Sequence, residues 1–269
     1  VSGQLKTSFI AALVLMSVDL KHLQCAEMFD FLKQRDSTAL AAERRDMVRI
    51  AQHCPNLHTL SVNVRLFDES ILMDMLASCT KIDTLDLSAC LRLTERSIQH
   101  LAITLTSLHT LRLDGNTIFL LELESLRHAA YSLTALDLRN CAYHKRSGLE
   151  TVLQTCHLLT TLTLQLSYVK YSYMGLDIEW PLMCNIQTLT LCNHVDDHAD
   201  PNCDTVYSNI AQYCVNLKNV HFDFIIVNIS QLTVIVEQCG LLRILALRML
   251  KFNDGDVVQQ WRMLKPELS

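Results

Sequence analysis

The densest group of side chains that could do chemistry lies in the segment 194–204. This segment contains imidazole, carboxylate and thiol side chains, which belong to His194, Asp196, Asp197, His198, Asp200, Cys203 and Asp204. Imidazole together with carboxylate would suit zinc or manganese. A solvated acidic turn is the alternative, because Asp and Asn side chains bond to nearby backbone and a loop lacks the rigidity of a metal site. We favour the turn, so the sequence predicts no bound metal and no cofactor.

Cysteine is the second candidate for chemistry. The chain has eleven cysteines, and an odd number argues against a complete disulfide framework. No C-x-x-C pair occurs, and the motifs of P-loop, dinucleotide-binding, zinc-protease and serine-hydrolase sites are absent. A catalytic thiol needs a low pKa and an exposed position. We expect instead buried, reduced thiols in a cytoplasmic or nuclear protein that is not an enzyme.

Aromatic side chains give the third candidate, a protein-binding site in the segment 166–181. Its aromatic and basic members are Tyr168, Lys170, Tyr171, Tyr173 and Trp180. Aromatic residues and arginine dominate the residues that carry binding energy in protein interfaces. Two interpretations stay open here: the aromatics contact a partner, or they cap the core over a missing helix turn.

One repeated unit must position these residues. It consists of an anchor residue, two residues, Leu, two residues, Leu, one residue and Leu. The anchors are Cys54, Cys79, Leu105, Ala130, Cys156, Met183, Cys214 and Cys239, at spacings of 25, 26, 25, 26, 27, 31 and 25 residues. A weaker first copy runs from Thr7 through Ile10 and Leu13 to Leu15. A fixed period of this length with L-x-x-L-x-L is typical of a leucine-rich repeat.

The spacing within the unit predicts its structure. Leu-x-Leu side chains point the same way from a short strand, and the 3–4-residue apolar spacing between strands indicates helices. We therefore expect an α/β leucine-rich-repeat solenoid of about nine repeats, curved, with parallel strands on the concave side and helices on the convex side. The prediction is one domain over 1–269, with an insertion at 16–53 and irregular loops at 166–181 and 192–204. Both loops should leave neighbouring strands at the same edge and touch, so we expect His194, Asp196 and Asp197 to join the aromatic segment in the predicted protein-binding site.

The concave positions carry charges of both signs. Asp86, Arg112 and Asp137 alternate on successive strands, which predicts pairing between adjacent strands and a face that neutralises itself. The alternative is a polar partner-binding surface, for which Arg112 and Arg139 are candidates. The mixed signs and the net charge of −5 disfavour nucleic acid as a ligand. The longest apolar run, Phe9–Met16, is far shorter than the ~20 residues that span a bilayer, so we expect no membrane partner.

Residues 85–102 read LDLSACLRLTERSIQHLA. This stretch resembles the cysteine-containing leucine-rich repeats of F-box proteins. The cysteine position before the strand is filled by Cys54, Cys79, Cys156, Cys214 and Cys239, and the position after it by Cys90, Asn116 and Cys141. The resemblance covers roughly residues 54–250.

The resemblance implies the substrate-recognition half of an SCF-type ubiquitin ligase. In that family an F-box binds the cullin adaptor, and the repeats present a protein target for ubiquitin transfer. The chain contains no F-box motif, so we expect any F-box to lie before residue 1. The alternative is a repeat scaffold without an F-box, similar to ribonuclease-inhibitor-like proteins.

Overall fold

The computed structural model describes residues 21–24, 48–49, 52–61, 69–88, 90, 93–115, 120–139, 141, 147–166, 179–193, 203–223 and 229–248. They fall into two compact units. The first unit comprises the described residues of 1–134 and 140–156, and the second unit those of 135–139 and 157–269. The single-domain organisation stays a prediction.

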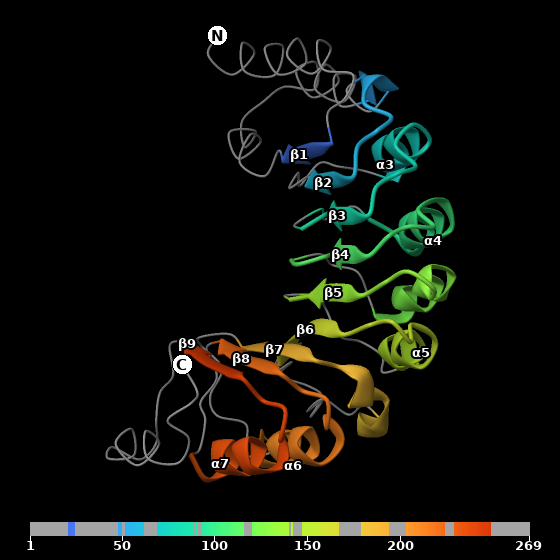
Figure 1. Ribbon diagram of the computed structural model, residues 1–269. Helices are drawn as coiled ribbons and strands as arrows, with labels where there is room; N and C mark the ends of the chain where they lie inside the picture. The colour runs from blue at the N-terminus through green and yellow to red at the C-terminus, as the bar shows by residue number, and fades with distance from the viewer. Residues whose placement is uncertain are drawn as a thin grey trace, which may run out of the picture. The chain divides into compact units, whose positions relative to one another are not determined.

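The first unit repeats a strand followed by a helix. Its parallel strands, paired in chain order, are β1 (His22–Gln24), β2 (Thr59–Ser61), β3 (Thr84–Asp86) and β4 (Thr110–Arg112). Its helices are α3 (Glu69–Leu76), α4 (Glu95–Thr104), the 3-10 helix η2 (Leu120–Ala129) and α5 (Ser147–Thr155). The helices lie on one side of the strands (Figure 1). Leu60, Leu85 and Leu111 share one register position and are fully buried, so the predicted Leu-x-Leu core is confirmed.

Strand β1 differs from the sequence prediction. It lies inside the segment 16–53, where the sequence predicts an insertion, and it pairs in register with β2, Leu23 opposite Leu60. The strand therefore adds a repeat read from Leu20-x-x-Leu23, and the copy expected at Thr7–Leu15 lies outside the described residues and stays a prediction. In the sequence, this copy has Ser17 at the anchor position and Cys25 in place of the last leucine, which is why the spacing alone misses it.

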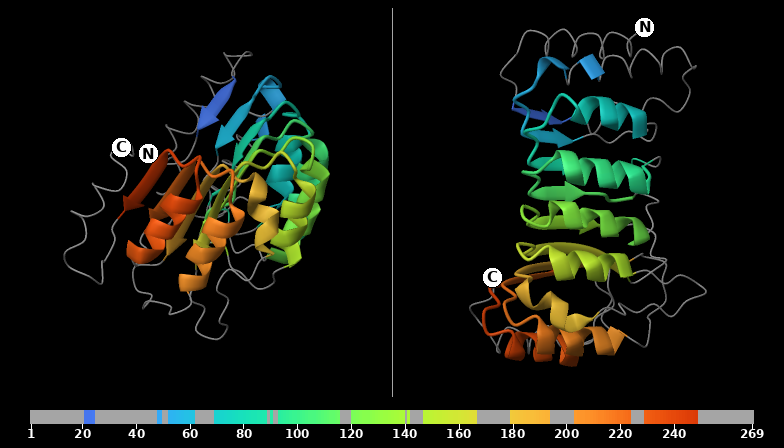
Figure 2. Two further views of the ribbon diagram at one scale, coloured as in Figure 1. Left: turned by 60° about the horizontal axis from the view of Figure 1, so that its bottom comes forward. Right: turned by 90° about the vertical axis from the view of Figure 1, so that its right-hand side faces the viewer.

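The second unit continues the same alternation. Its parallel strands are β5 (Ala135–Leu138), β6 (Thr161–Leu166), β7 (Thr188–Asn193), β8 (Asn219–Asp223) and β9 (Ile244–Arg248), again paired in chain order. Its helices are the 3-10 helix η3 (Trp180–Asn185), α6 (Cys203–Tyr213) and α7 (Ile229–Gln238). Helices α6 and α7 lie side by side, as the two views in Figure 2 show. The rings of Tyr207 and Phe222 meet in the core with centroids 5.5 Å apart.

Cysteine thiols connect successive repeats. The Sγ of Cys79 donates to the carbonyl oxygen of Cys54 at 3.5 Å, and that of Cys239 to the carbonyl oxygen of Cys214 at 3.8 Å. All of the anchor cysteines, from Cys54 to Cys239, are buried free thiols, so the predicted burial of these side chains is confirmed. A thiol fits here because it fills a small apolar space and still offers a weak donor to the backbone of the neighbouring repeat.

Candidate functional site on the strand face

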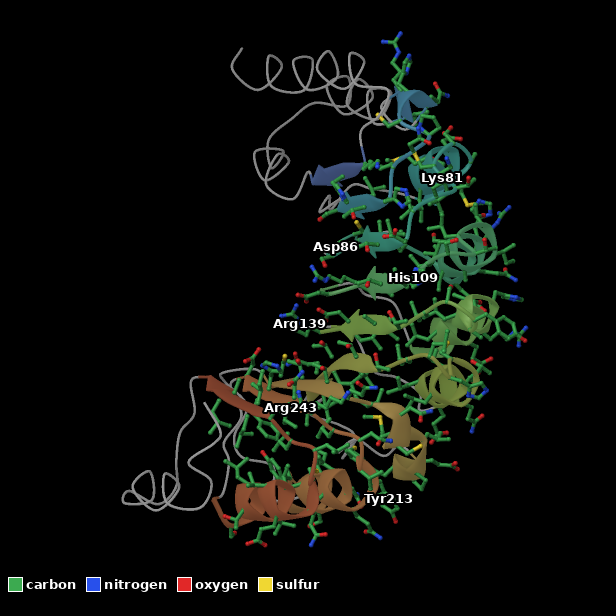
Figure 3. All side chains as sticks on the ribbon, in the orientation of Figure 1. Lys81, Asp86, His109, Arg139, Tyr213 and Arg243 are labelled. Atoms are coloured by element: carbon green, nitrogen blue, oxygen red, sulfur yellow. The ribbon has the colours of Figure 1, made fainter. Side chains whose placement is uncertain are left out.

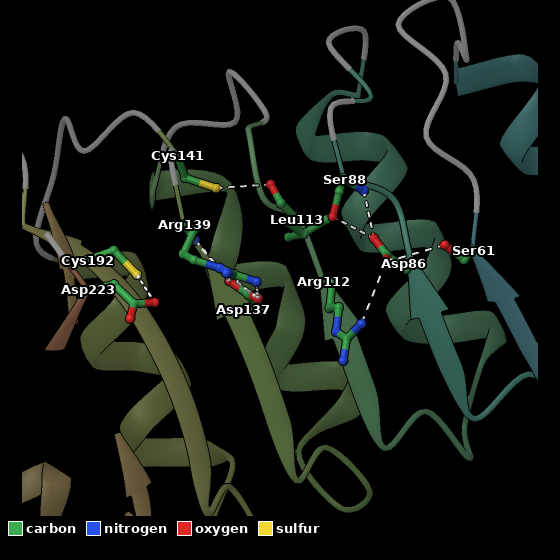
Figure 4. Close-up of polar contacts among 10 residues, drawn as sticks. All are labelled: Ser61, Asp86, Ser88, Arg112, Leu113, Asp137, Arg139, Cys141, Cys192 and Asp223. Carbon is green, nitrogen blue, oxygen red and sulfur yellow. Dashed lines mark hydrogen bonds and ion pairs between the residues drawn. The ribbon is translucent and has the colours of Figure 1, made fainter. Parts of the chain in front are cut away.

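The carboxylate of Asp86 organises the strand face of the first unit (Figure 4). Its Oδ1 accepts hydrogen bonds from the backbone N (3.0 Å) and the hydroxyl of Ser88. Its Oδ2 accepts a bond of 3.3 Å from the Ser61 hydroxyl on β2 and lies 3.8 Å from Nη1 of Arg112 on β4. Asp86 and Arg112 are register partners, so the predicted pairing between these adjacent strands is confirmed.

Asp137 finds its partner in a different way. Arg139, which follows β5, places Nη2 2.7 Å from Oδ2 and Nε 3.1 Å from Oδ1 of Asp137, a two-pronged ion pair. The backbone N of Arg139 donates to the same carboxylate at 3.1 Å. The predicted pairing of Asp137 with Arg112 on β4 would join the two units and stays a prediction. Residues two apart in a strand point to the same face, so an arginine at the strand end can fold back onto the aspartate.

These contacts determine whether the arginines of the strand face are available to bind a partner. Both arginines predicted to contact a partner, Arg112 and Arg139, already pair with an aspartate. A partner that bound either guanidinium would first have to compete with that carboxylate. The charges of these two arginines are thus already paired, which favours self-neutralisation at these positions over a charged docking surface.

The Asp86–Arg112 pair should contribute little to stability. The Arg112 side chain is 55% exposed and the atoms are 3.8 Å apart, so water screens the attraction. A double-mutant cycle of Asp86→Ala and Arg112→Ala, followed by urea unfolding, should give a coupling energy below about 1 kcal/mol. A coupling of several kcal/mol would contradict this account of the face.

The strand face of the second unit is polar and closely packed. Thr163 and Gln165 on β6 and Cys192 on β7 are all buried. The Sγ of Cys192 lies 3.9 Å from Oδ2 of Asp223 on β8, as Figure 4 shows, and this thiol donates to the carboxylate. Such bonds between adjacent strands fix the side chains of the face in place.

The strand ends of β6 and β7 bear on the predicted aromatic site. Leu166, the last residue of β6, is the register partner of Asn193, the last residue of β7. The segments that follow them therefore leave the sheet at adjacent points of one edge. The residues that carry the predicted site, Tyr168, Lys170, Tyr171, Tyr173, His194, Asp196 and Asp197, lie outside the described residues, and their contact stays a prediction.

Trp180 is the aromatic residue of this site that the structure does describe. It opens η3 and is only 7% exposed, in a helix whose other buried member is Met183. Its indole belongs to the core, so the prediction that Trp180 contacts a partner is corrected. For this residue the alternative of core capping holds.

Two absences concern the described residues alone. Within these ranges no cluster of three or more His, Cys, Asp or Glu side chains could hold a metal ion, and the predicted loop from His194 to Asp204 is largely outside them. In the same part of the chain, no helix has the length and apolarity needed to cross a membrane.

One surface was missed by the sequence reasoning. The turns that lead into β6, β8 and β9 expose Leu158, Val215 and Leu241. Each of these residues occupies one of the two positions that follow the anchor of its repeat, so a comparison of these positions across the repeats could have found the surface. In the repeats of β3 and β4 those positions hold Thr, Lys or Ser.

Comparisons with known proteins identify the fold. No family profile and no curated protein matches the chain. Among solved structures, a chain of the TLR13–ssRNA13 complex is 19% identical with a TM-score of 0.51, over 75% of this chain but only 27% of TLR13. A chain of the yeast Rad7–Elc1 complex is 12% identical with a TM-score of 0.50, over 100% of this chain and 82% of that one.

The leucine-rich-repeat-containing protein LegL7 from Legionella pneumophila is 16% identical with a TM-score of 0.50, over 84% of this chain and 79% of LegL7. At such identities the likeness concerns the fold and not the function. Together with the parallel strands, the backing helices and the 25-residue register of the core leucines, it shows that this chain has the α/β leucine-rich-repeat solenoid fold.

Proposed function

We propose that this chain is the substrate-recognition repeat domain of an F-box protein in an SCF-type ubiquitin ligase. The domain binds a target protein and catalyses no reaction itself. Three features support the proposal: the repeat fold, the resemblance of residues 85–102 to F-box repeat proteins, and the buried thiols at the anchor positions.

The adjacent ends of β6 and β7 are the observation that carries the choice of binding site. Leu166 and Asn193 are register partners, so the strands that precede the aromatic segment and the acidic segment end side by side. We assign target contacts to Tyr168, Tyr171, Tyr173 and Lys170 of the first segment. From the second segment we add His194, Asp196 and Asp197. Arg112 and Arg139 take a minor part, because their charges are already paired.

Protein is favoured over nucleic acid as the partner. Among the structural neighbours, Rad7 is solved with the protein Elc1 and TLR13 with an RNA. Affinity for RNA rests on lysines and arginines that neutralise phosphates. This chain carries a net charge of −5, and Arg112 and Arg139 of its strand face each pair with an aspartate. A protein target fits these charges better.

Capture of partners by the intact parent protein tests the proposal. Affinity purification followed by mass spectrometry should recover a target protein together with the cullin adaptor. Tyr171→Ala should reduce target recovery by roughly tenfold or more, as expected for an aromatic residue central to an interface. Tyr131→Ala is the matched control, because Tyr131 is 93% exposed on a turn of the first unit.

Other outcomes would reject parts of the proposal. Normal target capture by Ala variants of Tyr168, Tyr171 and Tyr173, with loss in Asp86→Ala or Arg139→Ala, would move recognition to the strand face. Recovery of a target without the cullin adaptor would favour a repeat scaffold over a ligase subunit.

A further inference from the structure

The turns that lead into β6, β8 and β9 of the second unit each expose one large apolar side chain, whereas the turn into β7 exposes Cys184 and Asn185 at the same repeat positions. Leu158 before β6, Val215 before β8 and Leu241 before β9 are 51%, 53% and 51% exposed. In the first unit, the turns into β3 and β4 expose polar side chains at the same repeat positions, namely Thr80, Lys81, Thr106 and Ser107, whereas Tyr131, which follows the anchor Ala130, is 93% exposed. Large apolar side chains that recur on one edge of a protein are typical of an interaction site.

Two cations lie beside these apolar residues. Lys218 and Arg243 each stand at the last turn position before a strand, and the backbone N of Arg243 donates to the carbonyl oxygen of Lys218 at 2.7 Å. They are therefore neighbours along the edge. Figure 3 labels Arg243 at the start of β9. We name Leu158, Val215, Leu241, Lys218 and Arg243 the turn edge.

The charges of the turn edge are not neutralised in the described part of the chain. The Lys218 ammonium donates to the amide oxygen of Gln187 at 2.8 Å, a contact that leaves its charge uncompensated. No described residue forms an ion pair with Arg243, and Glu237, exposed at the end of α7, is not within salt-bridge distance of it. This contrasts with Arg139, whose guanidinium is held by Asp137 at 2.7 Å.

The dimensions of the turn edge suit a short peptide. Neighbouring strands lie about 5 Å apart, so the three steps from β6 to β9 cover roughly 15 Å. An extended peptide covers that distance with about five residues. The apolar side chains stand at both ends of this span, and the two cations lie toward β8 and β9.

We propose that the turn edge binds a short acidic, apolar segment of a partner protein. Its apolar side chains cover Leu158, Val215 and Leu241, and its carboxylates pair with Lys218 and Arg243. The apolar residues alone would accept many partners, whereas two uncompensated cations on a chain of net charge −5 select carboxylates. This surface lies at the opposite ends of the strands from the loops of the proposed target site, so it goes beyond that function.

Selection of peptides on the intact chain tests this inference. A phage-displayed library of random peptides should enrich sequences that combine Asp or Glu with Leu, Ile or Val. One enriched peptide is then measured by fluorescence anisotropy against variants of the chain. Val215→Ser and Lys218→Glu should each weaken binding by about tenfold, and added salt should weaken it further.

The matched control is Lys81→Glu. Lys81 lies on a turn of the first unit and donates to the amide oxygen of Asn56 at 2.8 Å, as Lys218 does to Gln187, but its neighbours on the turn are polar. The Lys81→Glu variant should bind the peptide with unchanged affinity. A peptide whose acids are replaced by Lys should bind Lys218→Glu better than the original chain.

Several results would overturn the inference. One is enrichment of peptides that carry no acidic residues. Another is an unchanged peptide affinity in both Val215→Ser and Lys218→Glu. A third is a loss of peptide affinity in Lys81→Glu as large as that in Lys218→Glu. Self-association of the chain that Val215→Ser abolishes would assign the edge to a second copy instead. The Tyr171→Ala variant should bind the peptide normally, so that failure of the proposed target site and failure of the turn edge are told apart.

Discussion

Replacement of Trp180 by alanine should lower the free energy of unfolding by about 3–5 kcal/mol, the usual cost of truncating a buried tryptophan. The indole is 7% exposed, and Trp180 opens η3, a short 3-10 helix whose other buried residue is Met183. Truncation leaves a cavity that this six-residue element cannot easily close. Urea unfolding followed by circular dichroism measures the change.

Tyr131→Ala is the control for this experiment. Tyr131 is also a large aromatic residue but is 93% exposed, so its truncation should change the unfolding free energy by less than about 0.5 kcal/mol. A loss of stability in Trp180→Ala no larger than that of Tyr131→Ala would show that the indole is not a core residue. It would also restore Trp180 as a candidate for partner contact.

Trp180 illustrates what the sequence could not predict. Aromatic residues serve both cores and interfaces, and their spacing in an irregular segment gives no period from which to read a buried face. By contrast, the core leucines at positions 60, 85 and 111 follow a strict period, and the structure places all of them in one buried register. Prediction succeeds where the repeat fixes the geometry and stops where the period breaks.

The charged residues of the strand face show the same limit at a finer level. The period predicted correctly that Asp86 and Arg112 lie opposite each other, because both occupy the same repeat position. It could not predict that Asp137 is held by Arg139, because that choice depends on how a long side chain at a strand end folds back. The exposed Leu158, Val215 and Leu241 could be found only by comparing the two positions after the anchor across repeats, together with the observed burial.

The second large effect concerns the reactivity of the anchor cysteines in the folded chain. Burial raises the pKa of Cys79 to about 11 and that of Cys214 to about 12, with neighbouring thiols adding to each effect. The thiolate is the reactive form, so alkylation of both residues by iodoacetamide at pH 8 should be slower by orders of magnitude than after unfolding in urea. Cys184, which is exposed, should react readily and serves as the internal standard. Peptide mass spectrometry resolves the sites.

The raised pKa values also make stability depend on alkaline pH. An unfolded thiol ionises near its ordinary pKa of 9.0, whereas the buried thiol of Cys214 stays protonated until about 12. Above pH 9 the unfolded state therefore loses protons that the folded state keeps, and the free energy of unfolding should fall by up to about 1.4 kcal/mol per pH unit for this thiol. Below pH 9 both states are protonated, and the thiol gives no pH dependence.

Cys214→Ser separates this effect from other alkaline titrations. A serine hydroxyl does not ionise in this range, so the variant should show a shallower loss of stability between pH 9 and pH 11 in urea unfolding, whatever its starting stability. Rapid alkylation of Cys79 and Cys214 in the native chain, or an unchanged alkaline slope in Cys214→Ser, would mean that these thiols are accessible. Accessible anchors could not form the S–H to carbonyl contacts between Cys79 and Cys54 or between Cys239 and Cys214, and the repeat phase built on them would fail.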